Sequence, residues 1–166
     1  MSRFRRWSAD PAVVLRDPIH LVAFGFGAGL APIAPGTAGT VIAVPLVLWV
    51  MQFGWWVHLA CAAAACVLGI YVCGESARRL GVHDHPGIVW DEITGYAVTM
   101  LAVSSTRPDW WLLLGGFVLF RVFDIAKPWP IREADHSLSG GLGIMLDDVI
   151  AGIMAGLVLA GVDRLI

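Results

Sequence analysis

Two adjacent carboxylates, Asp147 and Asp148, stand inside an otherwise apolar segment that continues to Val162. A carboxylate at the centre of a membrane helix costs about 2.5–3.5 kcal/mol on insertion scales, so a side-by-side pair requires a compensating interaction. Gly152-Ile-Met-Ala-Gly156 follows at a GxxxG spacing, which lets another helix approach closely. The dipole of a solvated helix N-terminus would favour one acid there, whereas a bound metal ion accounts for both.

A second acidic pair, Asp91 and Glu92, begins another apolar stretch, with Gly95 one turn after the first acid. Upstream, the run His83-Asp84-His85 has the residue types of a transition-metal site. Because neighbours on one loop often cannot share an ion, we prefer a hydrated loop for the two histidines. The role of Asp84 stays open.

The segment from Arg121 to Arg132 combines a third acidic position, Asp124, with three cations. Asp124 and Lys127 are about one helical turn apart, and two prolines stiffen the chain after them. Alone, this segment is typical of a basic patch beside anionic lipid. Beside four other carboxylates, it favours an anion site that Arg121, Lys127 and Arg132 hold.

A glycine-rich segment, Ala34-Pro-Gly-Thr37-Ala-Gly-Thr40, precedes a long apolar run. We predict Thr37 as the N-cap of a helix, whose first amide groups would bind phosphate.

The acidic positions together predict a site of oxygen ligands for a hard cation, since Mg²⁺ prefers carboxylates, water and phosphate oxygens. The predicted ligands and catalytic residues are Asp91, Glu92, Asp124, Asp147 and Asp148, holding one or two Mg²⁺.

A competing signature lies between Cys73 and Arg79, whose Cys-x5-Arg spacing matches that of thiol-based phosphatases. That chemistry needs a thiolate in a phosphate-binding loop. Here Val72 precedes the cysteine and the segment is predicted to be the end of a helix, so we interpret the match as accidental.

The composition indicates a membrane setting for these acids. Hydrophobic residues make up 58% of the 166 and charged residues only 14%, where about 25% is usual in a soluble domain. The net charge of −2 gives no reason to expect nucleic acid as a partner. The three cysteines lack a metal-ligand spacing and are predicted to be core residues.

The apolar runs predict an all-α, multi-spanning membrane protein with about five transmembrane helices. The runs cover residues 36–57, 57–73, 93–103, 110–120 and 144–162. Two of them are shorter than the ~20 residues of a full span and must extend into flanking charged sequence. Residues 19–34, rich in glycine and proline, predict a re-entrant or interfacial segment. We predict an N-terminal tail over 1–18 and one membrane catalytic domain over 19–166.

Basic residues predict the orientation of the chain. With the N-terminus inside, nine of the eleven arginines and lysines lie on the cytoplasmic side, and only Arg107 and Arg164 lie outside. The positive-inside rule favours this arrangement, which brings the polar clusters to the cytoplasmic face.

These clusters, in this order, resemble the phosphatidylglycerophosphatase A family, bacterial membrane enzymes that dephosphorylate phosphatidylglycerol phosphate. The resemblance spans residues 21–156 and rests on four segments: Gly29-Leu-Ala-Pro-Ile-Ala-Pro-Gly-Thr37, Asp91-Glu-Ile-Thr-Gly95, Phe120-Arg-Val-Phe-Asp-Ile-Ala-Lys-Pro-Trp-Pro-Ile131 and Gly140-Gly-Leu-Gly-Ile-Met-Leu-Asp-Asp148. It implies a magnesium-dependent enzyme of the bacterial cytoplasmic membrane.

The expected reaction is hydrolysis of a lipid phosphate monoester, assisted by the metal ion. Thr37, Arg121, Lys127 and Arg132 would bind the phosphate. Water and an aspartate remain alternative nucleophiles, and the sequence does not indicate an oligomeric state.

Two other classes of function remain. A transporter would place its acids near the membrane midplane, often within repeated halves, and no repeat is visible here. A scaffold without activity would explain the packing glycines but not five carboxylates beside cations.

Overall fold

The computed structural model describes residues 9–131 and 139–165, and all regular structure in these two ranges is helical. The elements are α1 Pro11–Arg16, α2 Pro18–Ala23, the 3-10 helix η2 Gly25–Leu30, α3 Pro35–Met51, α4 Trp55–Leu80, α5 Trp90–Met100, α6 Trp110–Ala126 and α8 Gly140–Asp163. The prediction of an all-α protein is therefore confirmed for the described part of the chain.

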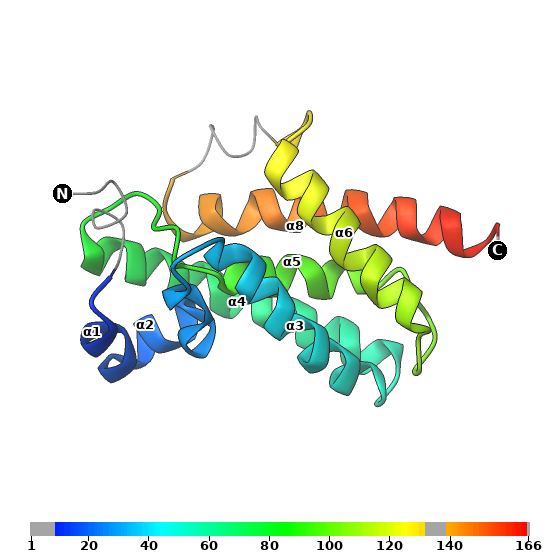
Figure 1. Cartoon of the computed structure of the whole chain (residues 1–166), viewed down its shortest axis with the longest axis horizontal. Helices are drawn as coiled ribbons and strands as arrows, with labels where there is room; N and C mark the ends of the chain where they lie inside the picture. The colour runs from blue at the N-terminus through cyan, green and yellow to red at the C-terminus, as the bar shows by residue number, and fades with distance from the viewer. Residues whose placement is uncertain (1–8, 132–138, 166) are drawn as a thin grey trace.

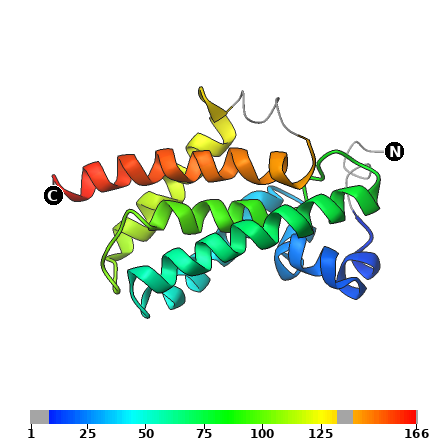
Figure 2. The same cartoon turned by 180° about the vertical axis from the view of Figure 1, so that it is seen from behind.

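Helix α8 runs along the length of the molecule and packs on α4, α5 and α6 (Figures 1 and 2). Helix α5 lies between α8 and α4 in both views and also contacts α3 and α6. Eight of its eleven residues are buried. At 1.5 Å per residue α5 is about 16 Å long, well short of the hydrocarbon core. Its neighbours enclose it within the bundle.

Small residues allow α8 to lie against its neighbours. A β-carbon on Gly152 would collide with the carbonyl oxygen of Gly95, and one on Gly156 would lie 3.0 Å from the carbonyl oxygen of Thr99. Near its start, Gly141 is similarly pressed against the carbonyl of Ile70 in α4. The close helix approach predicted from the GxxxG spacing is confirmed, and α5 is the partner.

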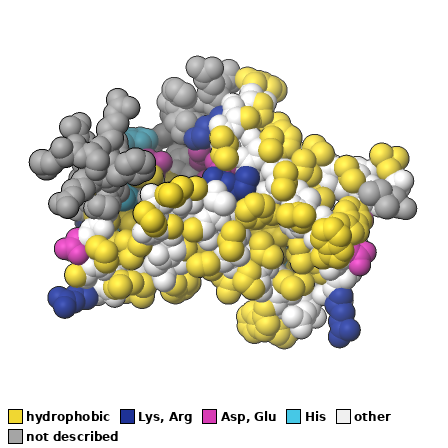
Figure 3. Space-filling model, viewed as in Figure 1, with side chains coloured by type: hydrophobic (Ala, Val, Ile, Leu, Met, Phe, Trp, Pro, Cys, Tyr) yellow, Lys and Arg dark blue, Asp and Glu magenta, His cyan; other side chains and the backbone are white. Residues whose placement is uncertain are grey.

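Large apolar side chains cover much of the outer surface. Figure 3 shows hydrophobic side chains over most of one face, with charged groups gathered beside the upper part of α6. Exposed examples include Trp49, Trp56, Val67, Tyr71, Trp110, Val118 and Leu157. Among the described helices, α4 and α8 are long and apolar enough to cross a membrane, and α3 is apolar but shorter. Continuous apolar surface of this kind marks a membrane or protein interface.

The glycine-rich N-terminal segment folds into α2 and η2, which pack against the loop that leads into α5. The backbone turns sharply within η2, where Phe26 has φ 56° and Gly27 has φ 102°. The amide of Val89 donates to the carbonyl of Ala23, 2.9 Å away. Helix α1 lies within the predicted tail, and its Val14 is completely buried in the apolar cluster that also contains Ala23 and Phe24. This packing sets where α5 begins.

Candidate active site

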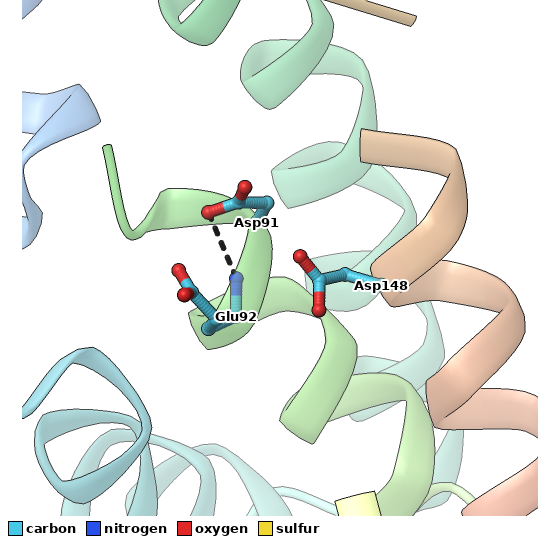
Figure 4. A group of neighbouring side chains, drawn as sticks. All are labelled: Asp91, Glu92 and Asp148. Atoms are coloured by element: carbon cyan, nitrogen blue, oxygen red, sulfur yellow. Dashed lines mark hydrogen bonds between the residues drawn. The ribbon is translucent and has the colours of Figure 1, made fainter. Parts of the chain in front are cut away.

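The first turn of α5 carries Asp91 and Glu92, where the helix dipole favours negative charge. Trp90, just before them, anchors the turn because its indole Nε1 donates to the carbonyl of Ala65 in α4, 3.0 Å away. The backbone amide of Glu92 donates to Asp91 Oδ1 at 3.1 Å, drawn as a dashed line in Figure 4. The two carboxylates are thereby placed at one end of the enclosed helix.

Asp148 reaches these two acids from α8, forming what we call the acid triad of Asp91, Glu92 and Asp148 (Figure 4). One carboxylate oxygen from each residue lies within 4.8 Å of the others. Asp91 is 7% exposed and Asp148 is 4% exposed. The close contacts of Gly95 with the backbone of Asp148 and of Gly152 with Gly95 bring the two helices near enough for this meeting.

The donor set of the acid triad fits a hard divalent cation. Within the described part of the chain, Glu92 Oε2 and Asp148 Oδ1 are buried and have no hydrogen-bond partner. Buried oxygens normally have one, so these two are available to a cation. Two oxygens on one octahedral Mg²⁺ lie about 3–4 Å apart. Because one oxygen from each acid already lies within 4.8 Å of the others, small side-chain movements would bring all three to one ion.

Helix α6 contributes a cation and a fourth acid. Arg121 Nη1 lies 2.7 Å from Asp124 Oδ2, one turn later on the same helix, and 3.7 Å from Glu92 Oε1. All three side chains are at most 15% exposed. The guanidinium therefore stands at the edge of the acid triad, held there by Asp124.

The last residue pair of the site joins α6 to α8. Lys127 Nζ lies 2.6 Å from Asp147 Oδ2. Lys127 caps α6 in a left-handed conformation with φ 41°, which is uncommon for a residue with a β-carbon. Because Asp147 and Asp148 project about 100° apart on α8, the first carboxylate faces this ammonium and the second faces α5.

The N-terminus of α3 closes another side of the site. A β-carbon on Gly36 would overlap Glu92 Oε1 and lie 3.2 Å from Arg121 Nη1. Thr37 is not the N-cap that we predicted: α3 begins after Ala34, so Thr37 lies inside the first turn. Proline at the first position, Pro35, is what moves the start of the helix upstream. Sequence reasoning missed Gly36, although a glycine in a helical first turn is the available signal.

The predicted hydrated loop for the two histidines is wrong for His85, which is buried. Its ring packs on Phe24 at 5.4 Å between centroids, and its Nδ1 accepts from the amide of Gly87. Burial lowers the pKa of His85, which the charge of Asp84 partly offsets. Nearby, His20 Nδ1 lies 2.8 Å from Ser76 Oγ. The contact with Phe24 holds the segment before α5 against the end of α2, and the His20–Ser76 pair joins α2 to α4. His83 and Asp84 are exposed, and Arg132 lies outside the described residues.

The Cys-x5-Arg segment forms one continuous part of α4, and no loop is present there. Cys73 is fully buried, with its Sγ 4.0 Å from Met145 Sδ. Arg79 pairs with Glu75 and with Asp17, at 2.7 and 2.6 Å. This geometry supports the interpretation of the motif as accidental.

Comparison with known proteins confirms the family resemblance seen in the sequence. The family model described as Phosphatidylglycerophosphatase A matches residues 21–163. Phosphatidylglycerophosphatase A of Escherichia coli is 41% identical over 89% of this chain and 84% of its own length. The protein of that name from Haemophilus influenzae is 43% identical over 91% and 92%.

A third relative, from Bacteroides thetaiotaomicron, is 33% identical over 84% of this chain and is provisionally named a phosphatidylinositol-3-phosphatase. No solved structure matches. With a family match over most of its length and two such relatives, this chain belongs to the phosphatidylglycerophosphatase A family.

Proposed function

We propose that this protein hydrolyses the terminal phosphate monoester of phosphatidylglycerol phosphate, releasing phosphatidylglycerol and inorganic phosphate. The names of the two most similar relatives given above support this substrate. The observation that carries the chemistry is the meeting of Asp148 with Asp91 and Glu92 beside the cation Arg121. The acids with unpartnered oxygens would hold a metal ion, and the guanidinium beside them would bind an anionic substrate.

The residues that would hold Mg²⁺ are those of the acid triad, whose oxygens converge; Glu92 Oε2 and Asp148 Oδ1 have no hydrogen-bond partner in the described part of the chain. When bound there, the ion would neutralise negative charge on the phosphoryl oxygens and the leaving alkoxide. Asp124 and Asp147, which sequence analysis also places among the ligands, act in this proposal by orienting Arg121 and Lys127.

The protein's cations bind the phosphate. Arg121 presents a planar fork of donors suited to phosphate oxygens, and Asp124 restricts its orientation. Lys127 adds a second positive charge where α6 meets α8. The amides of Gly36 and Thr37 lie in the first turn of α3, where intrahelical acceptors are absent. They are positioned to donate to an anion beside Arg121.

We further propose that residues 19–166 form one membrane domain of five passes, in which α3, α4, α6 and α8 contact the lipid and the short α5 provides its pass inside the bundle, with the site at the cytoplasmic face. Arg121 lies in the last turns of α6 and Lys127 directly follows it, whereas Arg107 precedes α6 and Arg164 follows α8. The start of α6 and the end of α8 lie at the same end of the molecule (Figure 1). This asymmetry of charge supports the orientation.

Labelling of introduced cysteines tests the orientation. In a chain whose native cysteines are replaced, Ser105→Cys should react with a membrane-impermeant reagent outside intact cells. Val82→Cys, in the exposed loop before α5, should react only after the membrane is opened. Labelling of both from the same side contradicts the proposed topology.

Phosphate release by the purified protein tests the activity. Phosphatidylglycerol phosphate should be hydrolysed with Mg²⁺ and not in chelator. Phosphatidylinositol 3-phosphate and phosphatidic acid, offered under the same conditions, report whether the head group is selected. Equal turnover of all three lipids contradicts the proposed substrate, and turnover unaffected by chelator contradicts the metal site.

A further inference from the structure

An open hollow of about 660 Å³ lies between η2 and α3. Its lining is almost wholly apolar and includes Ala28, Ile33, Thr37, Ala38, Val41 and Ile42. We refer to it as the α3 groove.

The α3 groove results from the different roles of the two faces of α3. Gly36, Thr40 and Val47 are among the residues that face the bundle and are buried. The residues at positions 37, 38, 41 and 42 recur at helical spacing on the outward side. There η2 overhangs them, because the left-handed conformation of Ala34, with φ 49°, turns the chain sharply between the two elements.

The α3 groove begins at the residue that follows the site's glycine in the chain. A β-carbon on Gly36 would meet Glu92 and Arg121, and the next residue, Thr37, lines the groove. From Ala34 to Ile42 the groove extends about 12 Å along α3. It leads away from the acids, with its single polar side chain, Thr37, at the end near the site.

We propose that the α3 groove binds the proximal part of an acyl chain of the lipid phosphate whose head group occupies the active site; this inference rests on the proposed function. An acyl chain suits the groove because the lining is apolar and uncharged. The position of the groove also suits an acyl chain. In a lipid phosphate the anionic head group and the apolar chain are joined through glycerol, and the groove begins next to the site that would hold the head group. Thr37 stands where the polar glycerol ester would lie.

The test compares a diacyl substrate with its deacylated head group. Val41→Trp fills the groove with a bulky ring, and Ala38→Leu does so more gently. Leu46→Trp is the matched control, because Leu46 is an exposed apolar residue of the same helix outside the groove. For each protein, KM and kcat are measured with dioleoyl phosphatidylglycerol phosphate in mixed micelles and with the water-soluble deacylated compound, and thermal stability is recorded.

Wild type should hydrolyse both substrates, with the lower KM for the lipid. A ring in the groove would displace the acyl chain, and loss of about 1.4 kcal/mol of binding corresponds to a tenfold change in affinity. We therefore expect Val41→Trp to raise KM for the lipid about tenfold, Ala38→Leu to raise it less, and neither to change KM for the deacylated compound. Leu46→Trp should change neither value.

Three results would overturn the inference. They are an unchanged KM for the lipid in both groove variants, an equal rise in Leu46→Trp, and an equal rise for the deacylated compound. Should Val41→Trp fold poorly, Ala38→Leu decides alone. Failure of wild type to release phosphate from either substrate refutes the proposed function instead, so the two failures are distinguishable.

Discussion

Two acidic clusters of this protein differ in how their negative charges are compensated. On the surface of α4, Glu75 contacts both Arg78 and Arg79, and Arg79 also contacts Asp17, at distances of 2.6–2.7 Å. Two acids face two cations there. Around the acid triad, the described residues bring five carboxylates together with the cations Arg121 and Lys127, and Glu92 Oε2 and Asp148 Oδ1 have no hydrogen-bond partner there.

The difference shows which cluster is built for a ligand. The α4 cluster is partly exposed, so water and its own arginines satisfy every charge, and such surface pairs contribute little to stability. Asp91 and Asp148 of the acid triad are buried, where an uncompensated carboxylate is costly. A protein retains such a group when a bound ion supplies the missing charge. The following substitutions test this contrast.

Asp148→Asn should have the largest effect, lowering Mg²⁺-dependent turnover by at least about 100-fold. Loss of a residue that only supports metal ligands already costs about 10–100-fold. The metal-free variant should be somewhat more thermostable than wild type, because removing one acid relieves like-charge repulsion. Turnover against Mg²⁺ concentration and unfolding in chelator are the measurements.

Glu75→Gln is the control for Asp148→Asn, because it removes a carboxylate of the self-compensated cluster. Its turnover and its dependence on Mg²⁺ should match wild type. Near-normal turnover in Asp148→Asn, or an equal loss in Glu75→Gln, would refute the contrast between the two clusters.

Gly152→Ala should come next, because it separates the helices that bring the acid triad together. The new β-carbon would collide with the carbonyl oxygen of Gly95, so α8 must move away from α5. Overpacking of this kind costs about 1–3 kcal/mol of stability, and we expect turnover to fall about tenfold or more because catalytic geometry is sensitive to small displacements. Thermal unfolding and turnover are measured together.

Gly161→Ala provides the matched control on the same helix, since nothing lies within 4 Å of a β-carbon at Gly161. It should retain activity and gain slightly in stability, as alanine favours a helix interior over glycine. Equal behaviour of the two variants would show that close approach of α5 and α8 does not matter to the site.

Asp147→Asn should have a smaller effect than Asp148→Asn, although the two residues are neighbours. Asp147 pairs with Lys127 across 2.6 Å and lies outside the acid triad. We expect KM for the lipid to rise about tenfold through loss of a charged hydrogen bond that orients Lys127. The Mg²⁺ concentration for half-maximal turnover should stay near that of wild type. A shift of that concentration as large as in Asp148→Asn would make Asp147 a metal ligand.

The sequence predicted the positions of the helices, because apolar runs are local signals. Residues 36–57 and 57–73 overlap α3 and α4, but α3 ends six residues earlier, at Met51, and α4 continues seven residues further, to Leu80. The run at 93–103 was placed about three residues late at both ends, since α5 begins at Trp90 and ends at Met100. Asp91 and Glu92 therefore lie inside α5, in its first turn.

Contacts between distant segments could not be predicted. Nothing in the sequence distinguishes Asp147 from Asp148, since only the packing of α8 between α5 and α6 turns one toward Lys127 and the other toward Asp91. Burial of His85 likewise depends on Phe24, 61 positions earlier in the chain. The α3 groove depends on the turn at Ala34, a residue type that rarely adopts a left-handed conformation.

Cys73→Ser should leave most of the activity intact. Cys73 is fully buried inside α4 and lies against Met145, without a phosphate-binding loop around it. Serine buries a hydroxyl in place of a thiol, which costs about 1–3 kcal/mol of stability when unpaired. Turnover and thermal unfolding are measured on the same preparation. Loss of turnover in a folded variant, with unchanged dependence on Mg²⁺, would restore the thiol mechanism.

Asp17→Asn should have the smallest effect, a slight loss of thermal stability with unchanged turnover. Burial tends to raise the pKa of Asp17, but the Ile19 amide and Arg79 outweigh it and hold that pKa below its ordinary value of 3.8. A carboxyl with a lowered pKa in the folded protein stabilises it above the unfolded pKa and loses this contribution as pH falls through the folded one.

The two proteins should therefore differ in unfolding temperature above about pH 4 and converge as the pH falls below 3.8, where the wild-type carboxyl becomes protonated. The difference should also shrink in high salt, because the pair with Arg79 is partly exposed. Unfolding temperatures in detergent at pH 3 to 7 and two salt concentrations measure both trends. A difference that grows toward low pH, or any loss of turnover, would show that Asp17 does more than attach α2 to α4.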